Sequence, residues 1–170
     1  APEFEFSDLH PFRCSMTKIS GRNILIATTG YTGEEGVELM PASEDASWLW
    51  ELIHKKGGIP CGLGARDILR LEAGLLLHGS DIGLQTNPVE ARLERFVASE
   101  GDFCGSAVIR SIQQAKPDRC LVGFKTITRG SVPRPHVPIM VSGNVIGEVT
   151  SGGYSPTLDS NIGLGYVPVR

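Results

Sequence analysis

The sequence lacks the features that mark several easily recognised functional classes. Its four cysteines are widely separated, without a CxxC pair, and its four histidines show no metal-ligand spacing such as HxxxH. It has no Walker-type lysine loop and no Gly-x-Ser-x-Gly nucleophile elbow. Positive charge is not in excess either, since the formal net charge is -3. A metal site, a nucleotide phosphate loop, a serine-hydrolase centre and nucleic-acid binding are therefore not predicted.

Long hydrophobic stretches are also missing. Runs such as Leu75–Leu77 are far shorter than the roughly 20 apolar residues that a membrane-spanning helix needs. The opening residues show no cationic segment followed by an apolar one, which is the pattern of a signal peptide.

The four cysteines are far apart in sequence, so we expect free, buried thiols in a reducing compartment. They are Cys14, Cys61, Cys104 and Cys120.

Composition and periodicity instead favour a folded chain with two parts that differ in their expected secondary structure. Hydrophobic residues make up 41% of the 170 residues and charged residues 21%, which allows a packed core. Helical spacing mixes with short strands before residue 116, and short β-prone runs separated by glycine and proline follow it. We therefore predict an α+β fold with a boundary near residue 116. The expected helices are 44–56, 65–76 and 106–115, and the expected strands are 14–19, 23–29, 36–40, 120–124, 139–141, 145–149 and 162–167.

Local signals add detail to these elements. Ser20-Gly21-Arg22 is a typical hairpin connection between the first two strands. The spacing of the first helix predicts a buried stripe of Ala46, Leu49, Trp50 and Ile53. Asn87-Pro88-Val89-Glu90 is typical of a helix start, with Asn87 as the cap and Glu90 reaching back to it.

The loop before the third strand holds the first candidate site residues. Glycines bracket Tyr31, a threonine and two adjacent glutamates. This is either a surface loop with solvated acids or a loop that lets a ligand approach the backbone, with Tyr31 stacking on the ligand. Glu38 follows between two apolar residues. It either faces solvent or lines a cleft, where its two carboxylate oxygens can match the adjacent N–H donors of a pterin edge.

Two arginines and a glutamate on the second expected helix form the other candidate group. Arg66 and Arg70 lie one turn apart and project from one side. They are either solvated, engaged in structural ion pairs, or, for Arg66, part of a binding site. Glu72 falls within the apolar stripe and therefore needs a partner, for which we expect an arginine from another segment.

Two stretches carry a family resemblance. Residues 29–39 read Thr-Gly-Tyr-Thr-Gly-Glu-Glu-Gly-Val-Glu-Leu, and residues 64–74 read Gly-Ala-Arg-Asp-Ile-Leu-Arg-Leu-Glu-Ala-Gly. Further matching segments follow in order at Asn87–Ala91, Asp102–Gly105, Val149–Leu158 and Gly165–Val167. Over nearly the whole chain, the sequence resembles the T-protein family of the glycine cleavage system, whose members are tetrahydrofolate-dependent aminomethyltransferases.

The resemblance implies a fold and a reaction. A folate-binding α+β domain over residues 1–115 would be followed by a C-terminal antiparallel β-barrel-like domain over residues 116–170, both incomplete. The family takes an aminomethyl group from the lipoyl arm of the glycine cleavage H-protein and releases ammonia. It passes the one-carbon unit to tetrahydrofolate, giving 5,10-methylenetetrahydrofolate. The implied location is the cytoplasm of a bacterium or the mitochondrial matrix of a eukaryote, with neither nucleic acid nor a membrane as partner.

The resemblance also assigns roles to single residues. Glu38 falls on the folate-binding glutamate of the family and Arg66 on its substrate-binding arginine, and Tyr31 joins them as a third substrate-binding candidate. No catalytic residue and no metal ligand is expected within this chain, because the family's catalytic aspartate lies upstream of residue 1. We therefore expect the natural protein to be longer at both ends and this chain alone to be inactive.

The sequence departs from the family pattern at residues 92–95, and other functions stay open. The family usually reads Gly-Leu-Gly-Trp there, whereas this chain reads Arg-Leu-Glu-Arg, so that Arg95 stands at the tryptophan position. One alternative is the folate domain of an enzyme like sarcosine or dimethylglycine dehydrogenase. The other is a folate-binding regulatory module without catalysis.

Overall fold

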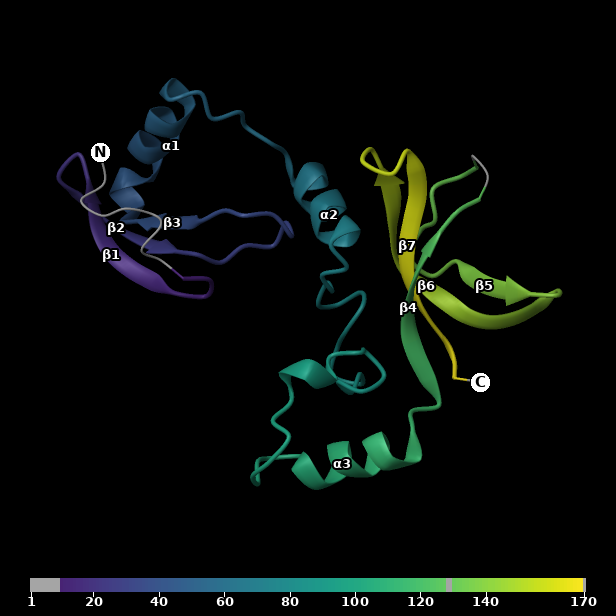
Figure 1. Cartoon of the computed structure of the whole chain (residues 1–170). Helices are drawn as coiled ribbons and strands as arrows, with labels where there is room; N and C mark the ends of the chain where they lie inside the picture. Colours follow the sequence, from purple (N-terminus) through teal and green to yellow (C-terminus); the bar gives the residue numbers. More distant parts are fainter. Residues whose placement is uncertain (1–9, 128–129, 170) are drawn as a thin grey trace. The chain divides into compact units, whose positions relative to one another are not determined.

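The structure is a computed structural model that describes residues 10–127 and 130–169. The chain divides into two compact units, the first ending at Leu69 and the second beginning at Arg70. Helix α2 (Leu63–Glu72) runs through this point (Figure 1). The predicted division into residues 1–115 and 116–170 concerns domains rather than these units, and it stays a prediction.

The first unit contains a three-stranded antiparallel sheet. Its strands β1 (Cys14–Ile19), β2 (Arg22–Ala27) and β3 (Glu38–Pro41) lie in that order. The predicted hairpin is present, because Ser20 and Gly21 connect β1 to β2 with φ values of 51° and 80°. Glycine adopts positive φ without a steric penalty, so its place in this turn follows from the backbone.

One face of this sheet forms a core with helix α1 (Ala46–Lys55), which follows the short 3₁₀ helix η2 (Ser43–Asp45) (Figure 1). Ile24 and Ile26 are fully buried against Leu49. Of the predicted stripe only Leu49 is buried: Ala46, Trp50 and Ile53 are exposed, and Trp48 packs on the core instead. The guanidinium of Arg22 lies 4.3 Å from the Trp48 ring centroid and pairs with the Asp45 carboxylate, which holds this side of the helix to the sheet.

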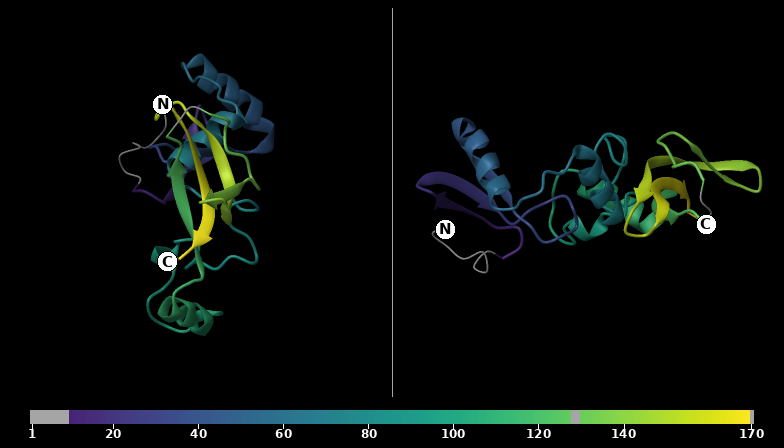
Figure 2. Two further views of the ribbon diagram at one scale, coloured as in Figure 1. Left: turned by 90° about the vertical axis from the view of Figure 1, so that its right-hand side faces the viewer. Right: turned by 90° about the horizontal axis from the view of Figure 1, so that it is seen from above.

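The second unit contains a four-stranded antiparallel sheet in the order β4-β7-β6-β5. Figure 2 shows its strands, coloured green to yellow, from two other sides. Among the described residues the sheet is open, with β4 and β5 as its edges, so the predicted α+β class is confirmed and no closed barrel is formed. The strands are β4 (Arg119–Lys125), β5 (Pro138–Val141), β6 (Asn144–Ser155) and β7 (Ser160–Pro168).

The two central strands are longer than predicted. The sequence Thr-Ser-Gly-Gly-Tyr-Ser at residues 150–155 has weak β propensity, yet it pairs with β7 beyond a register shift between Val149 and Ser151. Glycines let the backbones approach closely here. A Cβ atom added at Gly147 would lie 1.9 Å from the Tyr166 carbonyl oxygen, and one at Gly163 would lie 2.4 Å from the Phe124 ring. Pairing with β7 has therefore outweighed the weak β propensity of residues 150–155.

The core of the second unit joins the end of α2 to the sheet. Leu71 packs with Leu121, Ile162, Leu164 and Tyr166. The Tyr166 hydroxyl donates to the carbonyl oxygen of Asp81 at 2.8 Å. Burial, and then the negative charge of Glu90, raises the pKa of Tyr166 to about 12. This phenol therefore stays a hydrogen-bond donor throughout the neutral range.

One prediction about the helices of this unit is confirmed, and a second is confirmed only in its hydrogen bonds. Helix α3 (Ser106–Ala115) has the predicted bounds. The side chains of Asn87 and Glu90 form the predicted reciprocal cap: the backbone N–H of Asn87 donates to Glu90 Oε1 at 2.8 Å, and Asn87 Oδ1 accepts from the backbone N–H of Glu90 at 2.9 Å. Turns at residues 88–92 follow this cap directly, so it fixes a bend rather than starting a helix there.

Helix α2 ends at Glu72 rather than at Leu76, because the chain turns at Gly74 with φ 70°. The two arginines on this helix lie in different environments. Arg66 is exposed, whereas Arg70 is 2% exposed and pairs with Asp81 at 2.8 Å. Arg70 also donates a hydrogen bond to the Ser151 hydroxyl on β6 at 2.9 Å. Arg70 is therefore engaged in a structural ion pair rather than solvated.

Glu72 has partners other than the predicted arginine. Its carboxylate accepts hydrogen bonds from the hydroxyls of Ser155, at 2.5 Å, and Thr157, at 2.9 Å. A carboxylate at a helix C-terminus faces the negative end of the dipole, and these hydroxyls compensate. The Ser155 hydrogen bond is the main cause that lowers the pKa of Glu72, against the opposing effect of partial burial.

This shift predicts acid sensitivity. Because the folded-state pKa lies below the ordinary value of 4.5, Glu72 contributes stability above pH 4.5 and loses it as the pH falls through the lower folded value. Glu72→Gln should remove this part of the pH dependence. Urea unfolding at neutral pH and near pH 3, followed by circular dichroism, measures it. Equal loss of stability in the variant and the wild type would contradict the prediction.

The remaining sequence-based expectations concern cysteines, metals and membranes. All four cysteines are free thiols, but Cys14, Cys61 and Cys104 are exposed and Cys120 is half-buried, so the prediction of buried thiols is wrong. In the part of the chain that the structure describes, no group of three or more His, Cys, Asp or Glu side chains is placed to hold a metal ion. Nor does any described helix combine the length and apolar character needed to cross a membrane.

Candidate functional site

Glu38 is the first residue of β3, and the strand fixes its position. It pairs with Ala27 across the sheet, on the face opposite to Leu39, which packs on the core. The Glu38 side chain is exposed, and its Oε2 accepts a hydrogen bond from the hydroxyl of Thr29. Thr29 and Glu38 stand at the two ends of the glycine-rich loop, so this bond closes the loop at its base.

The loop itself carries Tyr31 toward helix α2. Gly33 turns the chain with φ 76°, and the Thr32 hydroxyl accepts a hydrogen bond from the Glu34 backbone at 3.3 Å. The Tyr31 ring is half-buried, and the guanidinium carbon of Arg66 lies 4.6 Å from its centroid. This distance is typical of a cation–π contact, in which the positive charge lies over the electron-rich face of the ring.

The structure therefore brings two of the three predicted site residues into contact. Tyr31 and Arg66 are far apart in sequence and touch, and Glu38 stands at the base of the loop that carries Tyr31. The contacts described for Glu38 and Arg66 do not join these two side chains to each other. Their convergence on one folate-sized cavity stays a prediction.

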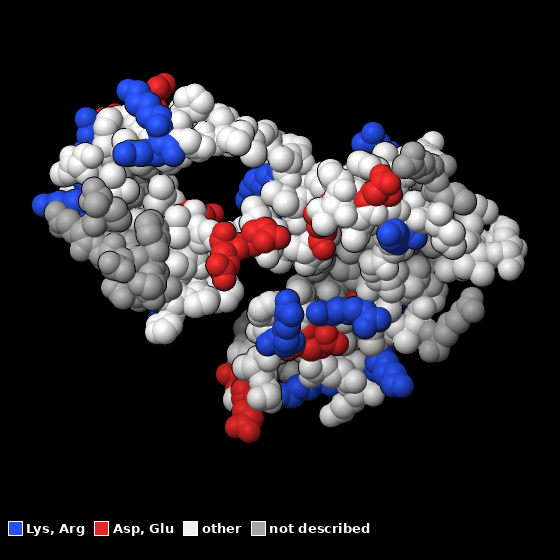
Figure 3. All heavy atoms as spheres, turned by 45° about the horizontal axis from the view of Figure 1, so that its top comes forward, with Lys and Arg blue, Asp and Glu red and all other residues white. Residues whose placement is uncertain are grey.

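The arrangement combines both signs of charge near an aromatic ring. Glu34 and Glu35 are exposed on the same loop, close in sequence to Tyr31, and Arg66 supplies the positive charge. Acidic and basic side chains are also interspersed over the face shown in Figure 3. The site offers a carboxylate as a hydrogen-bond acceptor and a guanidinium as a planar donor, which suits a ligand with both donors and acceptors.

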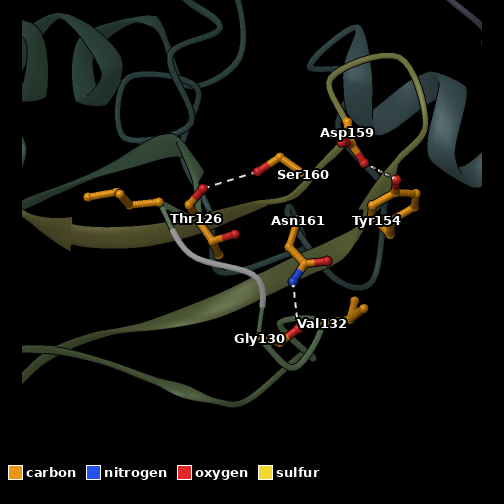
Figure 4. A pocket seen from close by; sticks show the side chains of 8 residues that line it. Thr126, Gly130, Val132, Tyr154, Asp159, Ser160 and Asn161 are labelled. Atoms are coloured by element: carbon orange, nitrogen blue, oxygen red, sulfur yellow. Dashed lines mark hydrogen bonds between the residues drawn. The ribbon is translucent and has the colours of Figure 1, made fainter.

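Three pockets in the second unit lie elsewhere. The first, of about 380 Å³, is shown in Figure 4, where Ser160 donates to the Thr126 carbonyl and Tyr154 donates to Asp159. Asn161 donates to the Gly130 carbonyl at its rim. Its polar groups are thus engaged with one another. The other two pockets adjoin Arg119, and none of the three is lined by a predicted site residue.

Arg95, at the position of the family tryptophan, lies in the 3₁₀ helix η3 (Glu94–Phe96). Its guanidinium carbon is 4.7 Å from the ring centroid of Phe96, which is 70% exposed. The aromatic surface at this turn therefore comes from the next residue along the chain.

Sequence reasoning missed two features of the site. It gave Thr29 no role, and it expected Tyr31 to stack on a ligand rather than on Arg66. A signal for Thr29 existed, because a hydroxyl residue and a carboxylate flanking a glycine-rich loop can close it by a hydrogen bond. No comparable signal existed for the Tyr31 contact, since it depends on where α2 lies in space.

Comparison with known proteins agrees with the motifs. Residues 2–101 match the family domain described as "GCVT N-terminal domain", and residues 119–170 match the "Glycine cleavage T-protein C-terminal barrel domain". The chain is 46% identical to the aminomethyltransferase of Symbiobacterium thermophilum over 171 residues, which covers 96% of this chain and 45% of that protein. It is 47% identical to the aminomethyltransferase of Synechocystis sp. over 147 residues, covering 85% and 39%.

A solved structure agrees as well. The crystal structure of the glycine cleavage system aminomethyltransferase T from Bartonella henselae superposes with a TM-score of 0.77 at 39% identity. The match covers 85% of this chain and 42% of that one. The chain thus spans less than half the length of these relatives. It belongs to the glycine cleavage T-protein family.

Proposed function

We propose that the chain forms part of a tetrahydrofolate-dependent aminomethyltransferase of the glycine cleavage system. The enzyme takes the aminomethyl group from the lipoyl arm of the H-protein, releases its nitrogen as ammonia, and transfers the one-carbon unit to tetrahydrofolate. The products are 5,10-methylenetetrahydrofolate and the dihydrolipoyl H-protein. The activity belongs in the bacterial cytoplasm, or in the mitochondrial matrix if the source is eukaryotic. We expect neither nucleic acid nor a membrane as a partner.

The contact of Tyr31 with Arg66, on a loop closed by Glu38, is the observation that best supports this proposal. The two oxygens of the exposed Glu38 carboxylate can accept the adjacent N–H and NH₂ donors of a pterin ring. Arg66 can bind a polar acceptor of the substrate through its N–H groups, and the Tyr31 ring lies against its guanidinium. These residues fit the donor pattern of a folate, which enters as the one-carbon acceptor.

The chain contributes binding residues to this proposal, and no catalytic residue or metal ligand is assigned within it. The acid that assists aminomethyl transfer would come from a folate-domain segment outside residues 1–170. Residues 1–115 would belong to the folate-binding domain and residues 116–170 to the C-terminal one.

Two measurements test the function. Titration of the 170-residue chain with tetrahydrofolate should give saturable binding, and the chain alone should not convert aminomethyl-loaded H-protein. A chimera in which the unmatched parts of the Symbiobacterium thermophilum relative flank this chain should release ammonia only when tetrahydrofolate and H-protein are both present. Conversion by the isolated chain, or a folded chimera that binds no tetrahydrofolate, would overturn the proposal.

A further inference from the structure

We propose that Tyr31 is a positioning residue that acts through Arg66 rather than by contacting the ligand itself. The inference rests on the proposed function and deepens it, because it says how the substrate-binding arginine is held before a ligand arrives. Tyr31 lies on the loop before β3 and Arg66 on helix α2, so the contact is a tertiary one within the first unit.

The need for such a contact follows from the exposure of Arg66. An exposed arginine side chain samples many rotamers, and ordering it on binding opposes ligand affinity. The guanidinium carbon lies over the aromatic face, 4.6 Å from the ring centroid, and this contact restricts where the group can move. The ring covers one side of the guanidinium, and the N–H groups that point away from the ring stay available to a ligand. The arginine is thereby preorganised.

The loop is built to hold the ring in place. The Thr29 hydroxyl bonds the Glu38 carboxylate at the loop base, and the Thr32 hydroxyl accepts from the Glu34 backbone next to the ring. Both bonds lie within ten residues of Tyr31 in sequence, so they order the segment locally. A ring on such a loop can fix a long side chain that reaches it from α2.

A double-mutant cycle separates this role from direct stacking on the ligand. If Tyr31 acts through Arg66, Tyr31→Leu weakens tetrahydrofolate binding by about two- to fivefold in the wild type and has no further effect in the Arg66→Lys background. Tyr31→Phe keeps the ring and should therefore weaken tetrahydrofolate binding less than Tyr31→Leu does. Equal losses from Tyr31→Leu in both backgrounds would mean direct ligand stacking and overturn the proposal.

A spectroscopic measurement tests the contact without a ligand. Protons over an aromatic face are shielded, so the Arg66 side-chain protons of the 170-residue chain should resonate upfield of an unstacked arginine. The upfield shift should persist in Tyr31→Phe and vanish in Tyr31→Leu. Its absence in the wild-type chain would overturn the positioning role. Its presence, together with no tetrahydrofolate binding, would leave the positioning role intact and contradict the proposed function instead.

A second positioning contact rests on a different observation, the hydrogen bond from Thr29 to Glu38. We infer that Thr29 orients the carboxylate by occupying one lone pair of Oε2 and leaving the rest of the carboxylate open to donors. Thr29→Val keeps the side-chain shape and removes the donor, so tetrahydrofolate affinity should fall severalfold, whereas Thr29→Ser should retain it. Equal affinities for the valine and serine variants would refute this role.

Discussion

Replacing Asp81 by alanine is expected to lower the free energy of unfolding of the second unit by about 3–5 kcal/mol. The Asp81 side chain is fully buried, and its carboxylate accepts hydrogen bonds from Arg70 at 2.8 Å, the Leu77 backbone at 2.9 Å and Thr150 at 2.5 Å. Alanine would remove the Asp81 charge from beside the buried Arg70 guanidinium. Removing one partner of a buried pair costs far more than the pair itself contributes.

Matched variants make this prediction specific. Glu148→Gln breaks the exposed pair between Glu148 on β6 and His136 in the turn before β5, and should cost no more than about 1 kcal/mol. The double replacement Arg70→Met/Asp81→Leu removes both charges and should recover much of the loss. Both tryptophans lie in the first unit, so hydrogen exchange of the β6–β7 amides is the appropriate measurement. Protection of those amides unchanged in Asp81→Ala would refute the prediction.

Replacing Glu38 by glutamine should weaken tetrahydrofolate binding by at least about tenfold, or roughly 1.4 kcal/mol. The substitution is nearly isosteric, but it turns one acceptor oxygen into an NH₂ donor that faces the donors of the pterin. Charge-assisted hydrogen bonds to a carboxylate contribute about 1.5–3 kcal/mol each, so the loss of one accounts for the expected change. Arg66→Lys should also weaken binding, because an ammonium does not reproduce a planar donor fork.

The chain offers a control for this substitution. Glu35 is an exposed carboxylate on the same loop, so Glu35→Gln makes the same change of charge without touching the candidate binding position. Its tetrahydrofolate affinity, measured by titration calorimetry, should stay close to that of the wild type. Equal affinities for Glu38→Gln and the wild type would exclude Glu38 from the site, although the family membership would stand.

Local sequence signals predicted much of the fold. The turn at Ser20 and Gly21, the bounds of α3 and the reciprocal cap of Asn87 and Glu90 depend on residues close in sequence, whose preferences the structure follows. The errors occur where distant residues decide. Residues 150–155 join β6 only because β7 pairs with them, and Trp48, whose ring Arg22 covers, packs on the core in place of Trp50.

The candidate site was predictable in its residues but not in its contacts. The resemblance to a family assigned Glu38 and Arg66, whereas composition and periodicity alone left both open between a solvated and a binding role. The stacking of Tyr31 on Arg66 depends on the placement of α2 beside the loop, which no local pattern encodes. The same limit applies to Arg70, whose partners Asp81 and Ser151 lie 11 and 81 positions away.

The close approach of β6 and β7 restricts how this part of the chain can vary. At Gly147 and Gly163, even a methyl group would collide with backbone or ring atoms of a neighbouring strand, so a random library should return only glycine there. Gly83, by contrast, has open space around its missing side chain and an ordinary backbone. Designers who diversify this protein therefore have freedom at positions such as Gly83 and very little between the two central strands.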